Sequence, residues 1–306
     1  MNLETFPKEV WWKLAARARQ AQQNGESVRR AVRSHFYNDI YSKWSKGKVS
    51  YSPNVAHEMD VGWSTMVGEW TKIQKSKESL GQQLKDDSVG KASVQGRNGP
   101  VSKARLWEKY NERPRGDRFQ FVVSMGGGMV LFNRMRRACQ QYIIEKLASK
   151  PDQFVIRGWK VFGEEGGWGR SDSCCVYTAV NYTDPELVKV VEGYIWPQVK
   201  DLVDQNFVPL GFFKVAGKPL WAMRMPDSNK AMSVLKVNKA TGSAGGLMGD
   251  VLSLAFKNAL TKTKEDKKSQ VMLKLFKPNK LRNKIVGELV EQAEFETQTL
   301  VTALYA

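Results

Sequence analysis

Several lysines and arginines stand inside or beside apolar, strand-like stretches of the chain. Lys160 lies in WKVF, Lys214 in FFKVAG and Arg224 in WAMRMP, while Arg118 opens its own strand and Arg170 ends a glycine-rich turn. A lysine surrounded by apolar residues loses pKa through desolvation and can act as a base, and an arginine offers a planar fork for phosphate. These residue types suit β-elimination of phosphate from phosphothreonine, in which cations stabilise the enolate and the leaving group. The alternative is that each is an ordinary strand residue facing solvent.

Other catalytic chemistries have less support in the sequence. The only histidines are His35 and His57, and no CxxC exists, so we propose no Ser-His-Asp triad and expect neither a metal site nor a cofactor. The glycine run 126–128 lacks both phosphate-loop patterns and is interpreted as a turn into a helix. Asp172, at the entrance of a strand, is either a catalytic carboxylate or a hydrogen-bonded turn residue.

Hydrophobic periodicity and capping signals predict the elements that position these residues. Asp184 is expected to cap a helix that has Pro185 at its first position. Helices are predicted at 7–24, 26–44, 58–80, 129–149, 184–205, 246–260 and 279–303, strands at 118–123, 154–162 and 173–180, and short further elements at 210–215 and 220–225.

The order of these elements predicts an α+β chain. Its helical N-terminal part is followed by a small mixed or antiparallel sheet packed with helices. Residues 86–103 are rich in glycine and serine, and we predict a flexible linker there. The expected domains are a basic helical region at 1–85 and an α+β domain at 104–306 that ends in a helix.

The chain of 306 residues has a net charge of +17, which is concentrated in residues 1–50, 101–150 and 251–306. Such an excess attracts anionic partners. An alternative function is therefore binding of single-stranded RNA or DNA, as in a viral nucleoprotein, without enzymatic activity. The candidate contacts are the arginines of two basic segments, Arg29, Arg30, Arg33, Arg134, Arg136 and Arg137. Clustering of Trp11, Trp12 and Trp44 with the first three on one exposed face would favour this alternative.

Three cysteines, two of them adjacent, argue against a disulfide framework and favour a reducing, cytoplasmic compartment. The N-terminal segment has no apolar core of a secretory signal, and no apolar run is long enough to span a membrane. We therefore expect no integral membrane association. Secretion into a host cell without such a signal is compatible with this pattern.

Residues 118–256 resemble the HopA-type effector family, which includes bacterial effectors and lyase components of peptide-modifying systems. The resemblance begins with the strand opened by Arg118-Phe119 and the strand bearing Lys160. It continues with Arg170-Ser171-Asp172 and a strand ending in Val176-Tyr177, which is similar to the family pattern R-x-D-x-x-V-x-Y. Further pieces are the segments 196–200, 208–212 and 217–226, and Ser243-Ala244-Gly245 before a helix.

The resemblance implies an α+β domain that binds a phosphorylated peptide or host protein. Under it, Lys160 is the candidate base and Tyr177 a candidate acid. The implied phosphate ligands are Arg118, Arg170, Lys214 and Arg224, and Asp172 would orient Arg170. The arginine that the family carries shortly after its S-F-G motif is absent from the matching stretch 246–249, and the region holds no histidine acid. Whether the chain is an enzyme or a non-enzymatic effector is therefore open at this point.

Overall fold

A computed structural model describes most, but not all, of the chain. The described residues are 1–44, 91–95, 105–109, 117–121, 134–135, 138, 155–162, 174–201, 203, 206–215, 218–239, 243–263 and 279–306. The helix predicted at 58–80 and nearly all of the one predicted at 129–149 lie outside these ranges.

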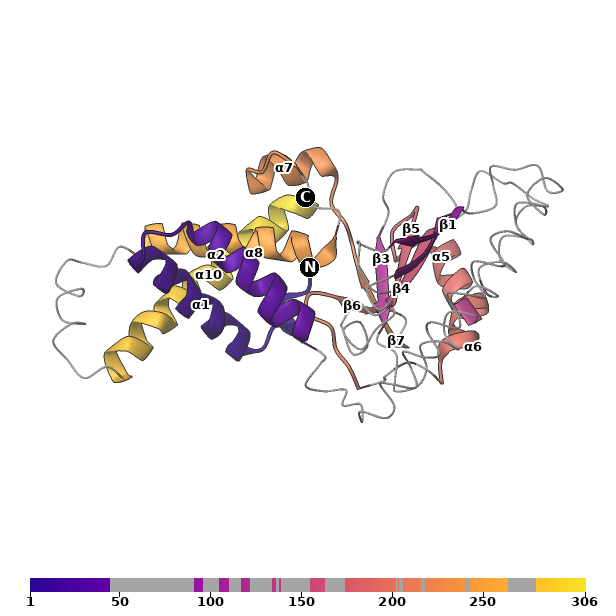
Figure 1. The fold of residues 1–306 in the computed structure, drawn as a ribbon, viewed down its shortest axis with the longest axis horizontal. Helices are drawn as coiled ribbons and strands as arrows, with labels where there is room; N and C mark the ends of the chain where they lie inside the picture. Colours follow the sequence, from indigo (N-terminus) through magenta and orange to yellow (C-terminus); the bar gives the residue numbers. More distant parts are fainter. Residues whose placement is uncertain are drawn as a thin grey trace. The chain divides into compact units, whose positions relative to one another are not determined.

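The chain divides into two compact units that do not follow sequence order. One unit combines residues 1–42 with 226–306, and the other holds residues 43–225. Helices make up the described part of the first unit, and every strand of the described chain belongs to the second (Figure 1). The linker predicted at 86–103 stays a prediction, because only Lys91–Gln95 of that stretch is described, as a strand.

The helical unit begins with a short 3-10 turn and ends with the longest helix. Its elements are η1 Leu3–Thr5, α1 Lys8–Gln23, α2 Val28–His35, the π-helical turn η2 Phe36–Ile40, α7 Ser228–Leu235, α8 Ala244–Lys262 and α10 Asn279–Tyr305. The 3-10 turn η3 Tyr41–Lys43 follows η2. The helices predicted at 7–24, 246–260 and 279–303 are confirmed, and the predicted helix 26–44 consists of α2, η2 and η3 in succession.

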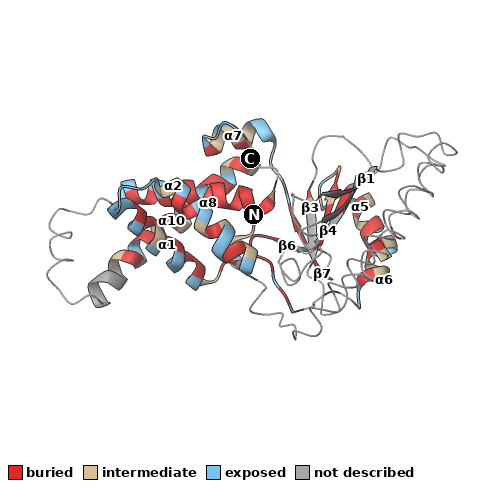
Figure 2. Cartoon of the chain, viewed as in Figure 1, coloured by how far each residue is buried: buried red, intermediate tan, exposed pale blue. Residues whose placement is uncertain are grey.

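Helix α8 is the centre of this unit. It packs against α1, α2, α7 and α10, and most of its length is buried, as the red ribbon in Figure 2 shows. The ring of Phe256 in α8 lies 6.2 Å from that of Trp11 in α1. Leu14 of α1 and Phe36 of η2 are buried in the same unit. Burial on nearly all sides explains why α8 is apolar around its whole circumference instead of along one stripe.

Two features allow α2 and η3 to lie close to α8. A Cβ atom on Gly245 would lie 2.5 Å from the ring of Tyr41, so only glycine permits this approach. One turn further on, the guanidinium of Arg33 forms an ion pair with the buried carboxylate of Asp250. Arg33 therefore supports the packing of the unit, while its side chain stays 46% exposed.

The second unit is built on one antiparallel sheet with strand order β1-β2-β4-β5-β3-β7-β6. The strands are β1 Lys91–Gln95, β2 Arg105–Lys109, β3 Arg118–Phe121, β4 Ile156–Phe162, β5 Cys174–Thr178, β6 Phe213–Val215 and β7 Lys218–Met223. Trp159, Cys174, Cys175 and Val176 are buried in its centre. The prediction of an α+β chain with a helical N-terminal part and a small sheet is confirmed.

A helical stretch in the same unit joins β5 to β6. It consists of α5 Pro185–Val190, the π-helical turn η6 Val191–Ile195 and α6 Trp196–Val199. The side chain of Asp184 accepts hydrogen bonds from the backbone N–H groups of Glu186 and Leu187, so the predicted cap with Pro185 at the first helical position is confirmed.

Candidate functional site

The register of the sheet brings four of the sequence-predicted positions onto one face. Lys160 of β4 pairs with Cys175 of β5, and the same cross-strand row ends at Lys214 of β6. Two residues along the strands, the next row on this face contains Tyr177 of β5 and Arg118 of β3, which pair directly. Because alternate residues of a strand share a face, these four positions lie on the same side of the sheet.

The spacing of strands shows which of these positions are neighbours. With about 4.8 Å between strands and about 3.4 Å per residue, the Cα atoms of Lys160 and Tyr177 lie about 8 Å apart, and those of Lys160 and Arg118 about 12 Å. Lys214 stands on the edge strand, about 19 Å from Lys160. Lys160, Tyr177 and Arg118 thus form a compact group, to which Lys214 is peripheral. We call these three the sheet-face triplet.

The exposure of the described side chains differs across this face. Tyr177 is half-buried, whereas Lys214 and Arg224, which directly follows β7, are exposed. Arg170 and Asp172 lie outside the described residues, so the roles implied for them stay predictions.

A buried aspartate that the sequence reasoning did not single out fixes this end of the sheet. The carboxylate of Asp117, which is 1% exposed, accepts one hydrogen bond from the backbone N–H of Tyr182 at 2.7 Å and one from that of Met225 at 3.1 Å. Its backbone oxygen accepts from both the N–H and the hydroxyl of Thr178. Asp117 therefore ties together the start of β3, the end of β5 and the end of β7. We call this arrangement the Asp117 clamp.

The electrostatics of the clamp follow from its burial. Desolvation raises the pKa of Asp117, and the two backbone hydrogen bonds and the positive charge of Arg224 oppose this rise. Burial and the charge of Asp117 raise the pKa of Tyr182, whose ring stacks on Phe213 of β6 with centroids 6.1 Å apart. A signal for the clamp was present in the sequence, because an acid directly before a strand is a turn and capping residue that often accepts backbone hydrogen bonds.

Two of the three arginines of α2 proposed to contact nucleic acid are held by contacts within the helical unit. Arg29 donates to the backbone oxygens of Leu235 and Lys236, and Arg33 pairs with Asp250. Arg30 is exposed. Trp11 is buried in the helical unit. The clustering that would favour this function is therefore not found among these residues.

The other basic segment proposed for nucleic acid is only partly described. The guanidinium of Arg134 binds both carboxylate oxygens of Asp201, at 2.6 and 2.8 Å. Arg136 and Arg137 lie outside the described residues. Nucleic-acid binding stays a prediction that these contacts do not favour.

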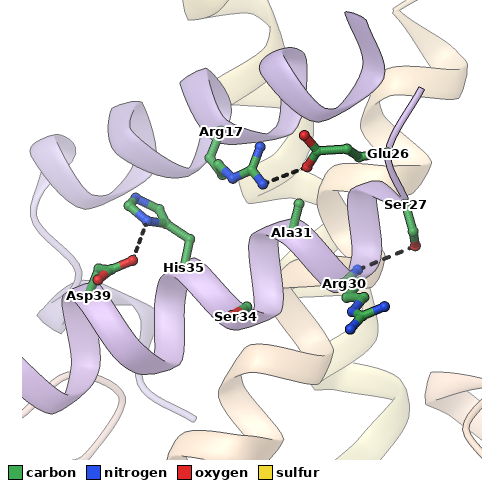
Figure 3. Close-up of a pocket in the computed structure, with 8 residues that line it drawn as sticks. All are labelled: Arg17, Glu26, Ser27, Arg30, Ala31, Ser34, His35 and Asp39. Carbon is green, nitrogen blue, oxygen red and sulfur yellow. Dashed lines mark hydrogen bonds and ion pairs between the residues drawn. The ribbon is translucent and has the colours of Figure 1, made fainter. Parts of the chain in front are cut away.

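A surface groove lies on the helical unit (Figure 3). It has a volume of about 560 Å³ and is lined by residues of α1, of the turn that follows it, of α2 and of η2, namely Arg17, Glu26, Ser27, Arg30, Ala31, Ser34, His35 and Asp39. We call it the α1–α2 groove. No group of three or more His, Cys, Asp or Glu side chains in the described parts of the chain is arranged to hold a metal ion.

Comparisons with known proteins find similarity in structure but not in sequence. No protein-family model matches the chain, and no curated protein matches it. Among solved structures, an effector protein of Pseudomonas syringae pathovar tomato is 12% identical, with 82% of this chain and 86% of that chain covered at a TM-score of 0.45. An effector protein of Pseudomonas syringae pathovar syringae is 13% identical, with 84% and 89% covered at a TM-score of 0.42.

The chain is thus similar in structure to effector proteins at low identity. Similarity at this level establishes neither a shared activity nor a shared ligand, and the HopA-type assignment stays a prediction. Within the described residues, no helix is long and apolar enough to cross a membrane.

Proposed function

We propose that the protein is an effector-like protein that binds a phosphorylated peptide or host protein at the sheet-face triplet, in the cytoplasm of a host cell. The observation that supports this proposal is the register of the sheet. Residues 118, 160 and 177 are distant in sequence, yet their positions fall on three adjacent strands and on one face. An arginine fork beside a lysine and a tyrosine hydroxyl is suited to a phosphate ester, because all three groups donate hydrogen bonds to its oxygens.

The same three residues supply the groups for β-elimination. In this reaction the neutral amine of Lys160 removes the α-proton of phosphothreonine, and the electron pair forms the Cα–Cβ double bond. The Cβ–O bond breaks and phosphate leaves, held by Arg118 and protonated by the hydroxyl of Tyr177. The proton taken by Lys160 then returns to the tyrosinate, so the products are a dehydrobutyrine residue and hydrogen phosphate. Lys214 provides a more distant cation on the same face for the rest of the ligand.

A binding assay with paired peptides tests the proposal. We expect a phosphothreonine peptide to bind the full chain more tightly than the same peptide with threonine. Arg118→Ala should weaken this binding about 10- to 100-fold, as expected for a charge-assisted hydrogen bond of about 1.5–3 kcal/mol. Lys189→Ala removes one positive charge from the exposed face of α5 and is the matched control, which should bind as the unaltered protein does.

Mass spectrometry of the same incubation tests the reaction. Loss of phosphoric acid from the peptide, abolished by Lys160→Ala but not by Lys189→Ala, would support elimination. Equal binding of the two peptides would overturn the proposed function. In that case a titration with single-stranded RNA at several salt concentrations decides on the alternative, since a log–log slope of several units indicates phosphate-backbone contacts.

A further inference from the structure

The α1–α2 groove has a floor of small side chains and charged ends. Ala31 and Ser34 lie in its middle, while Glu26 and Asp39 lie toward opposite ends (Figure 3). Ala31 is 7% exposed and belongs to the buried face of α2. The small side chains at positions 31 and 34 leave space in the middle of the groove. The volume of about 560 Å³ is in the range of sites that hold a ligand larger than a single ion.

Both acids that line the groove already have a hydrogen-bond partner within or beside it. The carboxylate of Glu26 accepts from Arg17 at 2.6 Å and from the side-chain amide of Asn24 at 3.1 Å. The carboxylate of Asp39 lies 3.0 Å from Nδ1 of His35. These pairs leave Arg30 as the cation of the groove whose guanidinium has no acidic partner among the described residues. Arg30 is therefore the group of the groove that can accept an anionic partner.

The contact between His35 and Asp39 determines whether the other ring nitrogen of His35, Nε2, donates or accepts a hydrogen bond. A carboxylate can only accept, so in the neutral imidazole the proton of this contact is on Nδ1. Nε2 is then left as a hydrogen-bond acceptor. His35 is the last residue of α2, and the π-helical turn η2 that contains Asp39 begins directly after it. Such turns occur frequently at functional sites.

The groove therefore offers an arginine fork for an oxyanion, hydroxyl groups of Ser27 and Ser34, and an imidazole acceptor for an N–H group. We propose that the α1–α2 groove is a binding site for an acidic peptide segment. A carboxylate side chain of the peptide binds Arg30, and a backbone N–H of the same peptide donates to Nε2 of His35. A single negative charge fits better than the two of a phosphate, because Glu26 and Asp39 place further negative charge at the ends of the groove.

This site belongs to the helical unit, so it is independent of the sheet-face triplet and of the function proposed there. Failure of one proposal leaves the other standing. Lys160→Ala, which tests the sheet, should leave peptide binding in the groove unchanged.

The test is a nuclear magnetic resonance titration of the full chain. The probe is an acetylated and amidated Gly-Glu-Gly peptide, and the signals followed are those of the Arg30 guanidinium and the His35 ring. We expect both signals to shift on addition of this peptide. The corresponding Gly-Gln-Gly peptide, which has no carboxylate, should bind at least about tenfold more weakly.

Three variants locate the site. Arg30→Gln removes the cation, and Ser34→Leu fills the middle of the groove without changing any charge, so each should weaken binding at least about tenfold. Lys13→Gln removes a charge from an exposed position of α1 outside the groove and should leave binding unchanged. Near-ultraviolet circular dichroism confirms that each variant is folded.

Several outcomes would overturn the proposal. Equal binding of the two peptides, or no shift of the Arg30 signal, would exclude a carboxylate site. Tighter binding of a Gly-phosphoserine-Gly peptide than of Gly-Glu-Gly would overturn the choice of a singly charged ligand. Binding of acetate as tight as that of the peptide, with no shift of the His35 ring, would remove the role of the peptide N–H.

Discussion

Replacing Asp117 by alanine removes both side-chain acceptors of the clamp and leaves the backbone N–H groups of Tyr182 and Met225 buried without them. Each unsatisfied donor costs about 1–3 kcal/mol. Part of this loss is offset at neutral pH, since burial raises the pKa of Asp117 and its ionised form is itself costly. We therefore expect the free energy of unfolding to fall by about 2–3 kcal/mol. For a unit of this size that corresponds to a decrease in Tm of about 5–10 °C.

Thermal and denaturant unfolding of the sheet-containing unit, followed by near-ultraviolet circular dichroism, measures this effect. Asp117→Asn keeps one acceptor and should cost about half as much. Glu9→Gln, at an exposed position of α1, is the control for loss of one negative charge and should change stability by less than about 0.5 kcal/mol. A change of that small size in Asp117→Ala would refute the clamp, because it would mean that the two N–H groups find other partners at no cost.

Three further predictions concern single contacts. Gly245→Ala should destabilise the helical unit by about 1–3 kcal/mol in chemical denaturation, since its Cβ would lie 2.5 Å from the ring of Tyr41; unchanged stability would mean that α8 and η3 are free to separate. The pKa of Glu296 is lowered, because hydrogen bonds, the strongest from Lys262, outweigh the raising effect of burial. Its folded pKa lies below the ordinary value of 4.5, so the stability it contributes is present above that value and is lost as pH falls through the folded pKa; stability curves of Glu296→Gln should lack this loss. Lys218→Ala breaks an exposed ion pair and should change the Tm by no more than the equivalent of about 1 kcal/mol; a larger change would show a role beyond that pair.

Local sequence signals predicted many of the elements correctly. Helix α1, the cap at Asp184 and strands β4 and β5 follow from periodicity and capping chemistry, which act over a few residues. The same reasoning missed α7, a helix of eight residues, because so short a segment shows little periodicity. It also interpreted 26–44 as one regular helix, since the π-helical turn η2 preserves the apolar positions Phe36 and Ile40 on the buried side.

Contacts between distant segments were beyond the reach of these signals. Arg29 and Arg33, two candidate contacts for nucleic acid, both bind groups more than 200 residues away. The Asp117 clamp likewise joins the ends of three strands. The shared face of Lys160, Tyr177 and Arg118 was also beyond reach, because it depends on strand register, which one sequence alone does not define. The types of the candidate residues are therefore read directly from the sequence, whereas their neighbours in space are not.

The discontinuous helical unit has a consequence for synthesis of the chain. Residues 1–42 are synthesised before residues 43–225, and their packing partners in 226–306 follow only after that whole intervening unit has been made. At about 5–20 residues per second this delay is about 10–40 s. During that time the apolar stripe of α1, with Trp11 and Leu14, has no α8 to cover it. Residues 1–42 are thus made early but reach their native contacts late, and a holding chaperone would have its natural target there.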